Sequence, residues 1–389
     1  NYGSIDNKFI PLGKNEKIHV PDGIAHFLEH KLFEKEDGDV FHDFGKQGAS
    51  ANAFTSFTRT TYLFSTTQDV QKNLLTLLDF VQSPYFTDKT VEKEKGIIGQ
   101  EIHMYDDNPD WRAYFGTIEN MYHNHPVKID IAGTIESISR ITKELLYECY
   151  ETFYHPSNML LFVTGPVDPE EICHLVEENQ AGKGYKPQPA VRRFFDDEPE
   201  TVAEKKKVIP MAVQTAKCMI GFKERRPGRV GNALLKHEIA VNTLLDLMFG
   251  ESSENYEQLY NEGLIDQSFF YDFTEEKQFG FSIIGGNTNQ PDELADRILD
   301  KIRKFRNKPI GEQAFQNVRK KKIGSFLSAL NSLEYIANQY TRYHFNQMNL
   351  FHVSNVLEQL TRNDVEEVLH EHFHDDALTV CQVVPNSGD

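Results

Sequence analysis

Two histidines and a glutamate, His26, Glu29 and His30, lie within five residues of one another in the segment GIAHFLEHKLF. On a helix, residues four apart project from the same face, so the two imidazoles can bind one metal ion. Glu29 lies at the edge of that face, where its carboxylate can accept a proton from a metal-activated water. This H-x-x-E-H order inverts the more familiar zinc-peptidase signature, although the spacing alone also fits an ordinary polar helix.

A third ligand is the test of such a site, because catalytic zinc usually has three protein ligands and one open position. The helical segment TVEKEKGIIGQEIHMYDD places Glu94 and Glu101 seven residues apart, two turns along one face. Ile97, Ile98 and Ile102 partly surround that face, and half-buried carboxylates are costly unless a cation meets them. We therefore predict that Glu101 completes the site and that Glu94 orients a ligand histidine.

A second His-rich segment, LHEHFH, matches H-E-x-x-H from His370 to His374. The residues that follow, DDALTV, end the helix, and few remain before the chain ends to supply a third ligand. We interpret this segment as a solvated helix C-terminus, where histidines complement the helix dipole.

The predicted elements place the first motif on a helix that starts after Gly23 and buries an apolar side. After Gly48, the stretch ASANAFTSFTRTTYLFSTT has the composition of two strands with a turn near Thr58-Arg59. A long helix is expected over residues 88–106, and NMLLFVTG reads as a strand.

The order of elements repeats in the second half of the chain. Thr142 and Thr361 open matching helix–loop–strand segments 219 residues apart, and Gly48 and Gly263 lie 215 apart. Such nearly constant offsets predict two copies of one α+β domain. The expected divisions are a metal-bearing domain at 1–182, a Gly-, Pro- and charge-rich linker at 183–207, and a homologous inactive domain at 208–389.

Composition excludes several classes of function. The net charge of −18 over 389 residues argues against nucleic acid, which would be repelled. No run reaches the ~18–20 apolar residues that span a bilayer, and the N-terminal segment lacks the apolar core of a signal peptide. Four scattered cysteines without CxxC spacing favour reduced thiols, so we expect a cytoplasmic protein without a membrane span.

Taken together, GIAHFLEHKLF, GASANAFTSFTRTTYLFSTT and the pair Glu94 and Glu101 resemble the pitrilysin family over essentially the whole chain. That family includes insulin-degrading enzyme and the mitochondrial processing peptidase, and the nearest resemblance is to bacterial YmfH-type members. The resemblance implies that His26, His30 and Glu101 bind one Zn²⁺ per chain. It implies that Glu29 is the catalytic base and that Glu94 is a supporting glutamate.

The same resemblance implies the fold and the mode of peptide binding. The expected fold is α+β, with two homologous domains that each have an antiparallel-rich sheet and helices packed on one face. Peptides would add as a strand to a sheet edge, which here corresponds to Asn52, Ala53 and Phe54.

Two departures from the family pattern bear on function. The second copy has AVNTLLDLMF at the position of the metal helix, so one site per chain is expected. The Arg–Tyr pair of many active members is not recognisable, although Tyr260 and Asp266 fall near the expected places. We expect a zinc metalloendopeptidase that cleaves peptides or unfolded segments, as a homodimer or a heterodimer with a homologous chain. The alternative is a non-catalytic or half-site peptide-binding subunit that needs such a partner for activity.

Overall fold

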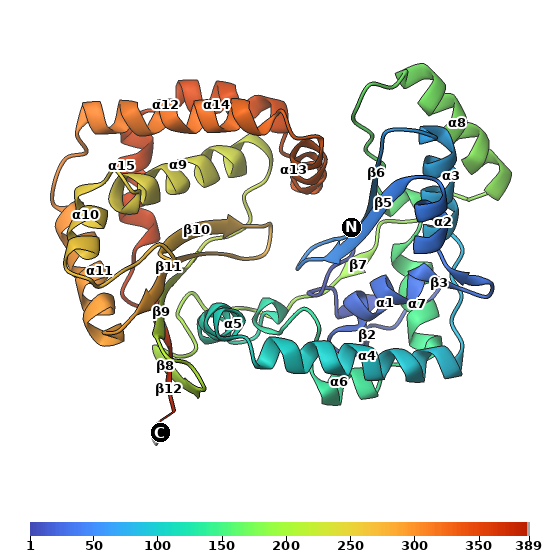
Figure 1. Ribbon diagram of the computed structural model, residues 1–389, viewed down its shortest axis with the longest axis horizontal. Coiled ribbons are helices and arrows are strands. Elements are labelled where there is room, and N and C mark those ends of the chain that lie inside the picture. Colours follow the sequence, from blue (N-terminus) through green and yellow to red (C-terminus); the bar gives the residue numbers. More distant parts are fainter. Residues whose placement is uncertain (387–389) are drawn as a thin grey trace. The chain divides into compact units, whose positions relative to one another are not determined.

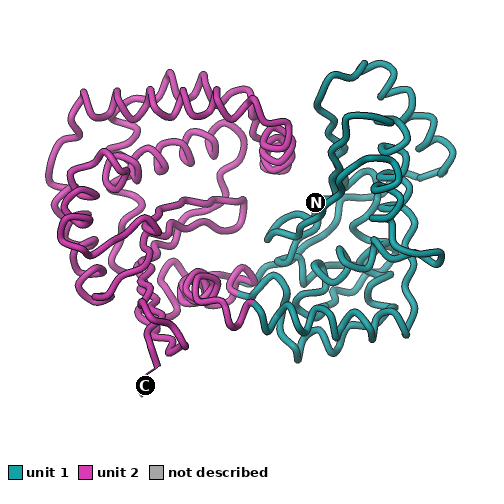
Figure 2. The backbone as a smooth tube through the Cα atoms, in the orientation of Figure 1, with its two compact units in different colours: residues 1–104, 129–196 teal, residues 105–128, 197–389 magenta. Residues whose placement is uncertain are grey.

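The computed structural model describes residues 1–386, in which helices alternate with short strands (Figure 1). Contacts divide the chain into two compact units (Figure 2). Unit 1 consists of Asn1–Met104 and Ile129–Asp196, and unit 2 consists of Tyr105–Lys128 and the chain from Asp197 onward. Residues 105–128 thus belong to unit 2 although they precede the predicted linker. The boundaries at 182 and 208 stay a prediction about the duplicated segments.

Unit 1 contains three small ladders, all antiparallel, in the orders β2-β1-β7, β5-β6 and β3-β4. The strands are β1 (Lys8–Ile10), β2 (Ile18–His19), β3 (Glu34–Lys35), β4 (Gly38–Asp39), β5 (Ala49–Thr55), β6 (Thr60–Thr66) and β7 (Arg192–Arg193). The predicted hairpin after Gly48 is confirmed, and its turn closes where the N–H of Ser56 donates to the carbonyl of Arg59. The predicted linker is not structureless, because β7 pairs with β1.

The helices of unit 1 include the two that bear the metal motif. They are α1 (Ile24–Phe33), α2 (Phe41–Lys46), α3 (Val70–Val81), α4 (Asp88–Asp106), α6 (Ile135–Ser139), α7 (Lys143–Phe153), η2 (Pro156–Asn158) and α8 (Pro169–Lys183). The predicted helix over 88–106 is confirmed. The predicted strand in NMLLFVTG is wrong, since residues 159–164 have no strand assignment. Apolar, β-branched composition predicts an extended backbone, but a strand also needs a hydrogen-bonded neighbour that composition does not specify.

Unit 2 is built on a five-stranded sheet in the order β10-β11-β9-β12-β8. Its strands are β8 (Lys206–Met211), β9 (Ala216–Lys223), β10 (Phe270–Glu275), β11 (Gly280–Thr288) and β12 (Leu378–Pro385). All neighbours are antiparallel except β12 and β8, which are parallel. The predicted antiparallel-rich α+β fold is therefore confirmed.

Helices cover both faces of this sheet. They are α5 (Pro109–Met121), η1 (Pro126–Lys128), α9 (Gly231–Phe249), α10 (Glu254–Asn261), α11 (Pro291–Arg306), α12 (Glu312–Ala329), α13 (Leu333–Phe345), η3 (Leu350–His352), α14 (Val353–Gln359) and α15 (Arg362–His372). On β9, Ile220 and Phe222 join the core that includes α9. Gly221, which faces the other way, approaches α5 so closely that a Cβ there would lie 2.6 Å from Cγ2 of Thr117. Helix α5 is an addition to the predicted single helical layer.

Local geometry supports the predicted duplication. Gly48 and Gly263 both have φ of 69°, a left-handed conformation that favours glycine. Thr142 and Thr361 both cap a helix, accepting a hydrogen bond from the third residue after them. Within residues 1–386, no helix has both the length and the apolar composition that crossing a bilayer requires.

Candidate metal centre

Helix α1 carries the first half of the site and is buried almost all round. Phe27, Leu28 and Leu32 are fully buried on it, and its two site histidines follow the four-residue spacing. Gly23 is the N-cap of this helix and has a φ of 86°, and a Cβ there would lie 2.3 Å from the carbonyl oxygen of Ala132. Glycine is required at this entry because any side chain would collide with backbone.

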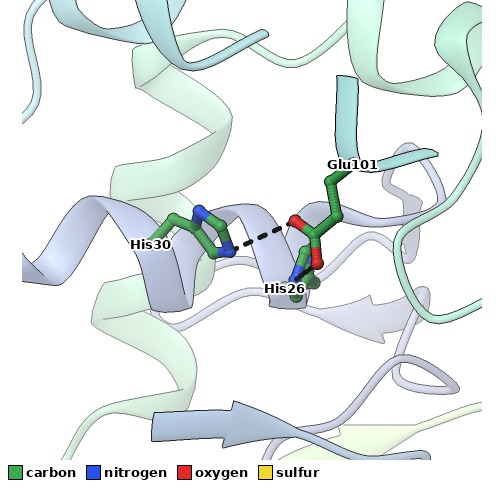
Figure 3. Close-up of side chains that lie close together, drawn as sticks. All are labelled: His26, His30 and Glu101. Atoms are coloured by element: carbon green, nitrogen blue, oxygen red, sulfur yellow. Dashed lines mark ion pairs between the residues drawn. The ribbon is translucent and has the colours of Figure 1, made fainter. Parts of the chain in front are cut away.

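Helix α4 brings Glu101 to these histidines (Figure 3). Nε2 of His26 lies 3.6 Å from one carboxylate oxygen of Glu101, and Nε2 of His30 lies 3.6 Å from the other. The rings of His26 and His30 are 4.6 Å apart, centre to centre. Among the described residues, these three form the one group of potential ligands close enough to share an ion. The predicted convergence of residues 26, 30 and 101 is present.

The donor set fits a zinc ion. Tetrahedral Zn²⁺ with ligands at about 2.1 Å separates its ligand atoms by roughly 3.4 Å, close to the two spacings of 3.6 Å. Nδ1 of His26 is buried without a hydrogen-bond partner in the described chain. A metal bound at Nε2 would leave the ring proton on Nδ1, so His26 lacks the acceptor that Glu94 offers to His30.

The charge of the surrounding side chains also favours a bound cation. Glu29, Glu94 and Glu101 gather around two histidines, and Glu29 and Glu94 are each only 7% exposed. Buried carboxylates in such number are unfavourable without a compensating cation. A divalent ion at this position would balance most of that charge.

Glu94 supports the second histidine. Its Oε1 lies 3.1 Å from Nδ1 of His30, on the far side of the ring from the nitrogen that faces Glu101. A carboxylate in this position fixes the tautomer and ring orientation of a ligand histidine. Of the flanking isoleucines expected to shield this face, Ile98 and Ile102 are buried, whereas Ile97 is 45% exposed.

The two histidines titrate differently. Burial, reinforced by the charge of His30, lowers the pKa of His26 to about 3, which keeps it neutral as a ligand must be. Burial alone would lower the pKa of His30, but its hydrogen bond with Glu94 and the carboxylates of Glu29 and Glu101 raise it overall. Protons therefore compete with a metal mainly at His30.

Glu29 has the environment of a general base. Burial raises the pKa of its carboxyl group, and a hydrogen bond from Thr55 opposes this in part. A raised pKa brings a carboxylate nearer to the range in which it accepts and returns protons efficiently. Thr55, whose Oγ1 donates to Oε2 of Glu29 at 2.6 Å, was not predicted as a site residue. Its only signal was its position at the end of the strand that contains the predicted substrate residues.

The predicted substrate residues lie on β5. Among the described ladders, β5 pairs only with β6, so its other edge is open. Asn52 is exposed, and its side-chain oxygen accepts from the N–H of Ala53 at 2.9 Å. Phe54 is half-buried, with the guanidinium of Arg59 5.5 Å from its ring centre.

The competing motif near the C-terminus does not form a site. His372 is 1% exposed, and its Nε2 lies 2.7 Å from Oγ of Ser282. His374 lies beyond the end of α15, while His370 is exposed. The prediction of a solvated helix end is wrong for His372, because this turn of α15 packs against the sheet.

Comparisons with known proteins agree with this geometry. Residues 12–135 match the family described as insulinase (peptidase family M16), and residues 140–322 match the peptidase M16 inactive domain. A Bacillus subtilis protein, described as the uncharacterized zinc protease YmfH, is 64% identical over 386 residues, covering 99% of this chain and 90% of that protein. The chain belongs to the M16 peptidase family. Within this M16 chain, the group of potential ligands lies in the region matched to insulinase, apart from the region matched to the inactive domain.

Solved structures support the M16 fold. An M16-like peptidase from Alicyclobacillus acidocaldarius has a TM-score of 0.94 and 43% identity, covering 99% of this chain and 91% of that one. A protease from Helicobacter pylori has a TM-score of 0.82 and 21% identity, covering 93% and 89%, and it supports the fold alone.

Proposed function

We propose that this M16 chain is a zinc-dependent endopeptidase that cleaves peptides or unfolded segments, with Glu29 as general base. The observation that carries the proposal is the convergence of His26, His30 and Glu101 beside a buried Glu29. It is supported by relatives that are named zinc proteases.

His26, His30 and Glu101 would hold one zinc ion, and Glu94 would orient His30. When bound, zinc polarises a carbonyl group and lowers the pKa of water. Thr55 engages Oε2 of Glu29, which leaves Oε1 to take the proton of the attacking water. Glu29 then returns this proton to the leaving amine, so that the departing group is neutral.

The substrate would lie along β5. Asn52, Ala53 and Phe54 follow the open edge of this strand, and an added peptide strand would bond to its backbone. Binding through the backbone tolerates many side chains, which fits a peptidase of broad range. In this scheme the side chain of Asn52 releases the N–H of Ala53 when a peptide arrives.

A partner chain is part of the proposal. Tyr260 is half exposed on α10, and Asp266 accepts hydrogen bonds from Ser268. Because Asp266 is an acidic residue, these two residues do not form the Arg–Tyr pair of many active members. The surface cavity at Tyr260 also has Glu251 and Glu257 in its lining. This acidic character favours the second candidate, a half-site or non-catalytic peptide-binding subunit that depends on a homologous partner. We propose a dimer, with either a second copy or a homologous chain, in the cytoplasm.

The test is Glu29→Gln, measured with the chain alone and co-expressed with a homologous partner. We expect peptide turnover to fall by roughly 10²–10⁴-fold while about one zinc per chain is retained. Glu92→Gln, an exposed change on α4, is the control and should leave turnover intact. Turnover that survives Glu29→Gln or chelation would exclude the mechanism. Zinc and peptide binding without turnover in any combination would favour the subunit.

A further inference from the structure

Thr55 is the side chain that holds the carboxylate of Glu29. Its Oγ1 donates to Oε2 of Glu29 at 2.6 Å, across 26 residues of sequence and from a strand to a helix. We propose that Thr55 is a positioning residue that fixes the orientation of Glu29. This inference rests on the proposed function, in which Glu29 is the general base.

Thr55 is itself held on two sides. It is the last residue of β5, where it pairs with Thr60 across the hairpin. The two threonine hydroxyls lie 3.2 Å apart in packing contact, because each donates its one hydrogen elsewhere. Thr55 donates to Glu29, and Oγ1 of Thr60 donates to the carbonyl of Tyr2 at 2.9 Å. The backbone pairing of β5 and the contact with Thr60 therefore fix the position of the hydroxyl that meets Glu29.

The need for such a holder follows from the geometry of glutamate. Helix α1 fixes the Cα of Glu29, but three side-chain torsions separate that atom from the carboxylate. A threonine hydroxyl has one hydrogen, and donating it to Oε2 selects Oε1 as the oxygen that faces the reaction. Reacting groups held in the correct orientation gain rate by large factors, and these are lost when the group can turn away.

The test compares Thr55→Val, which keeps the shape but removes the hydroxyl, with Thr55→Ser, which restores it. We expect Thr55→Val to lower kcat about 10–100-fold, with KM and zinc content within about twofold of wild type. Thr55→Ser should recover kcat to within about threefold. Thr66→Val is the matched control, because Thr66 lies at the other end of β6 and donates to the carbonyl of Gln68. It should leave all three quantities unchanged.

A second measurement does not use activity. In crystals of the metal-free chain, Glu29 should occupy one orientation in wild type and in Thr55→Ser, and more than one in Thr55→Val. If Thr55→Val does not fold, Thr55→Ala removes the same hydroxyl with a smaller side chain and should lower kcat about 10–100-fold.

The outcomes separate this inference from the proposed function. An active wild type with unchanged kcat in Thr55→Val, or in Thr55→Ala where that variant has to be used, overturns the positioning role and leaves the peptidase intact. A fall in kcat that Thr55→Ser does not rescue, or that is matched by loss of zinc, also overturns it. If wild type has no turnover with any partner, the peptidase proposal fails. In that case the orientation of Glu29 in the crystals tests the role of Thr55. A single ordered carboxylate of Glu29 in Thr55→Val overturns the inference.

Discussion

Nδ1 of His30 lies 3.1 Å from Oε1 of Glu94, while Nε2 of the same ring lies 3.6 Å from Oε2 of Glu101. One imidazole is thus held between two carboxylates that come from the same helix, two turns apart. The nitrogen near Glu94 is fixed by a hydrogen bond, and the other nitrogen is left facing the place where a metal would bind. The spacing of two glutamates on α4 therefore determines the ring orientation of a histidine on α1.

Replacing Glu94 with glutamine should weaken zinc binding without abolishing it. The three ligands remain, but His30 loses the carboxylate that holds its tautomer, and such losses typically cost 10–100-fold in affinity. Competition with a chromophoric chelator measures the change. Glu92→Gln on the same helix is the control, since the Glu92 side chain is 69% exposed and should leave affinity unchanged. Equal affinities for wild type and Glu94→Gln would mean that Glu94 does not orient His30.

Replacing His26 with alanine should remove the bound metal. Wild-type protein is expected to contain about one zinc per chain by elemental analysis, and His26→Ala should contain less than about a tenth of that. Zinc that binds only the folded chain also raises its unfolding temperature, so added zinc should stabilise wild type but not the variant. His103→Ala, an exposed change on α4, should behave as wild type. Full zinc content in His26→Ala would place the metal elsewhere.

Replacing Ala53 with proline should impair peptide binding. The N–H of Ala53 bonds to the side chain of Asn52, so it points away from the β6 ladder. Proline removes this outward donor and no ladder bond. We expect KM for peptides to rise at least about fivefold, with zinc content unchanged. Asn52→Ala removes the side chain that bonds to this N–H but keeps the N–H itself. Because the backbone donor remains, the rise in KM expected for Ala53→Pro should be absent in Asn52→Ala. An unchanged KM in Ala53→Pro would exclude strand addition at this position.

Acid should destabilise unit 2 through Glu224. Burial would raise its pKa, but His372, whose Nδ1 lies 3.5 Å from Glu224, together with the charge of His237, lowers it to about 2. The depressed pKa stabilises the fold above about pH 4.5, and this contribution is lost as pH falls towards 2. It is worth about 3 kcal/mol. Glu224→Gln should therefore be less stable than wild type at pH 6 and similar to it near pH 2.

Trp111 provides the readout for that experiment. It is the one tryptophan of the chain and lies on α5, within unit 2, so its fluorescence follows the unfolding of that unit in urea. Glu371→Gln is the control, because its side chain is 55% exposed and lies 3.9 Å from Arg229. A stability difference that stays constant from pH 6 to pH 2 would contradict the role of the Glu224 charge.

The sequence predicted those parts of the site that depend on helical spacing. His26 and His30 at four residues, and Glu94 and Glu101 at seven, specify a face with no knowledge of the tertiary fold. Thr55 could not be found this way, because its contact with Glu29 joins a strand to a helix and follows no period. Only the packing of β5 against α1 brings the two side chains together.

The same limit applies to the fold. The hairpin of β5 and β6 and the helix α4 follow from local patterns and turn signals. The assignment of α5 to unit 2 depends on Gly116 and Gly221, whose lack of a side chain lets the helix approach the sheet. That approach joins segments far apart in the chain, and no local pattern records it. The missing strand at 159–164 is the reverse case, in which composition was favourable but no ladder formed.

All three potential metal ligands come from α1 and α4 in the first half of the chain. The corresponding helix of the second half, α9, buries His237 against Glu275 at 2.6 Å. After a gene doubles, selection needs to preserve reactive imidazoles in one half alone. The other half becomes free to vary wherever volume and charge balance are maintained. Substitutions along α9 in descendants of this chain should therefore follow side-chain size and apolarity, whereas those along α1 should spare the potential ligands His26 and His30.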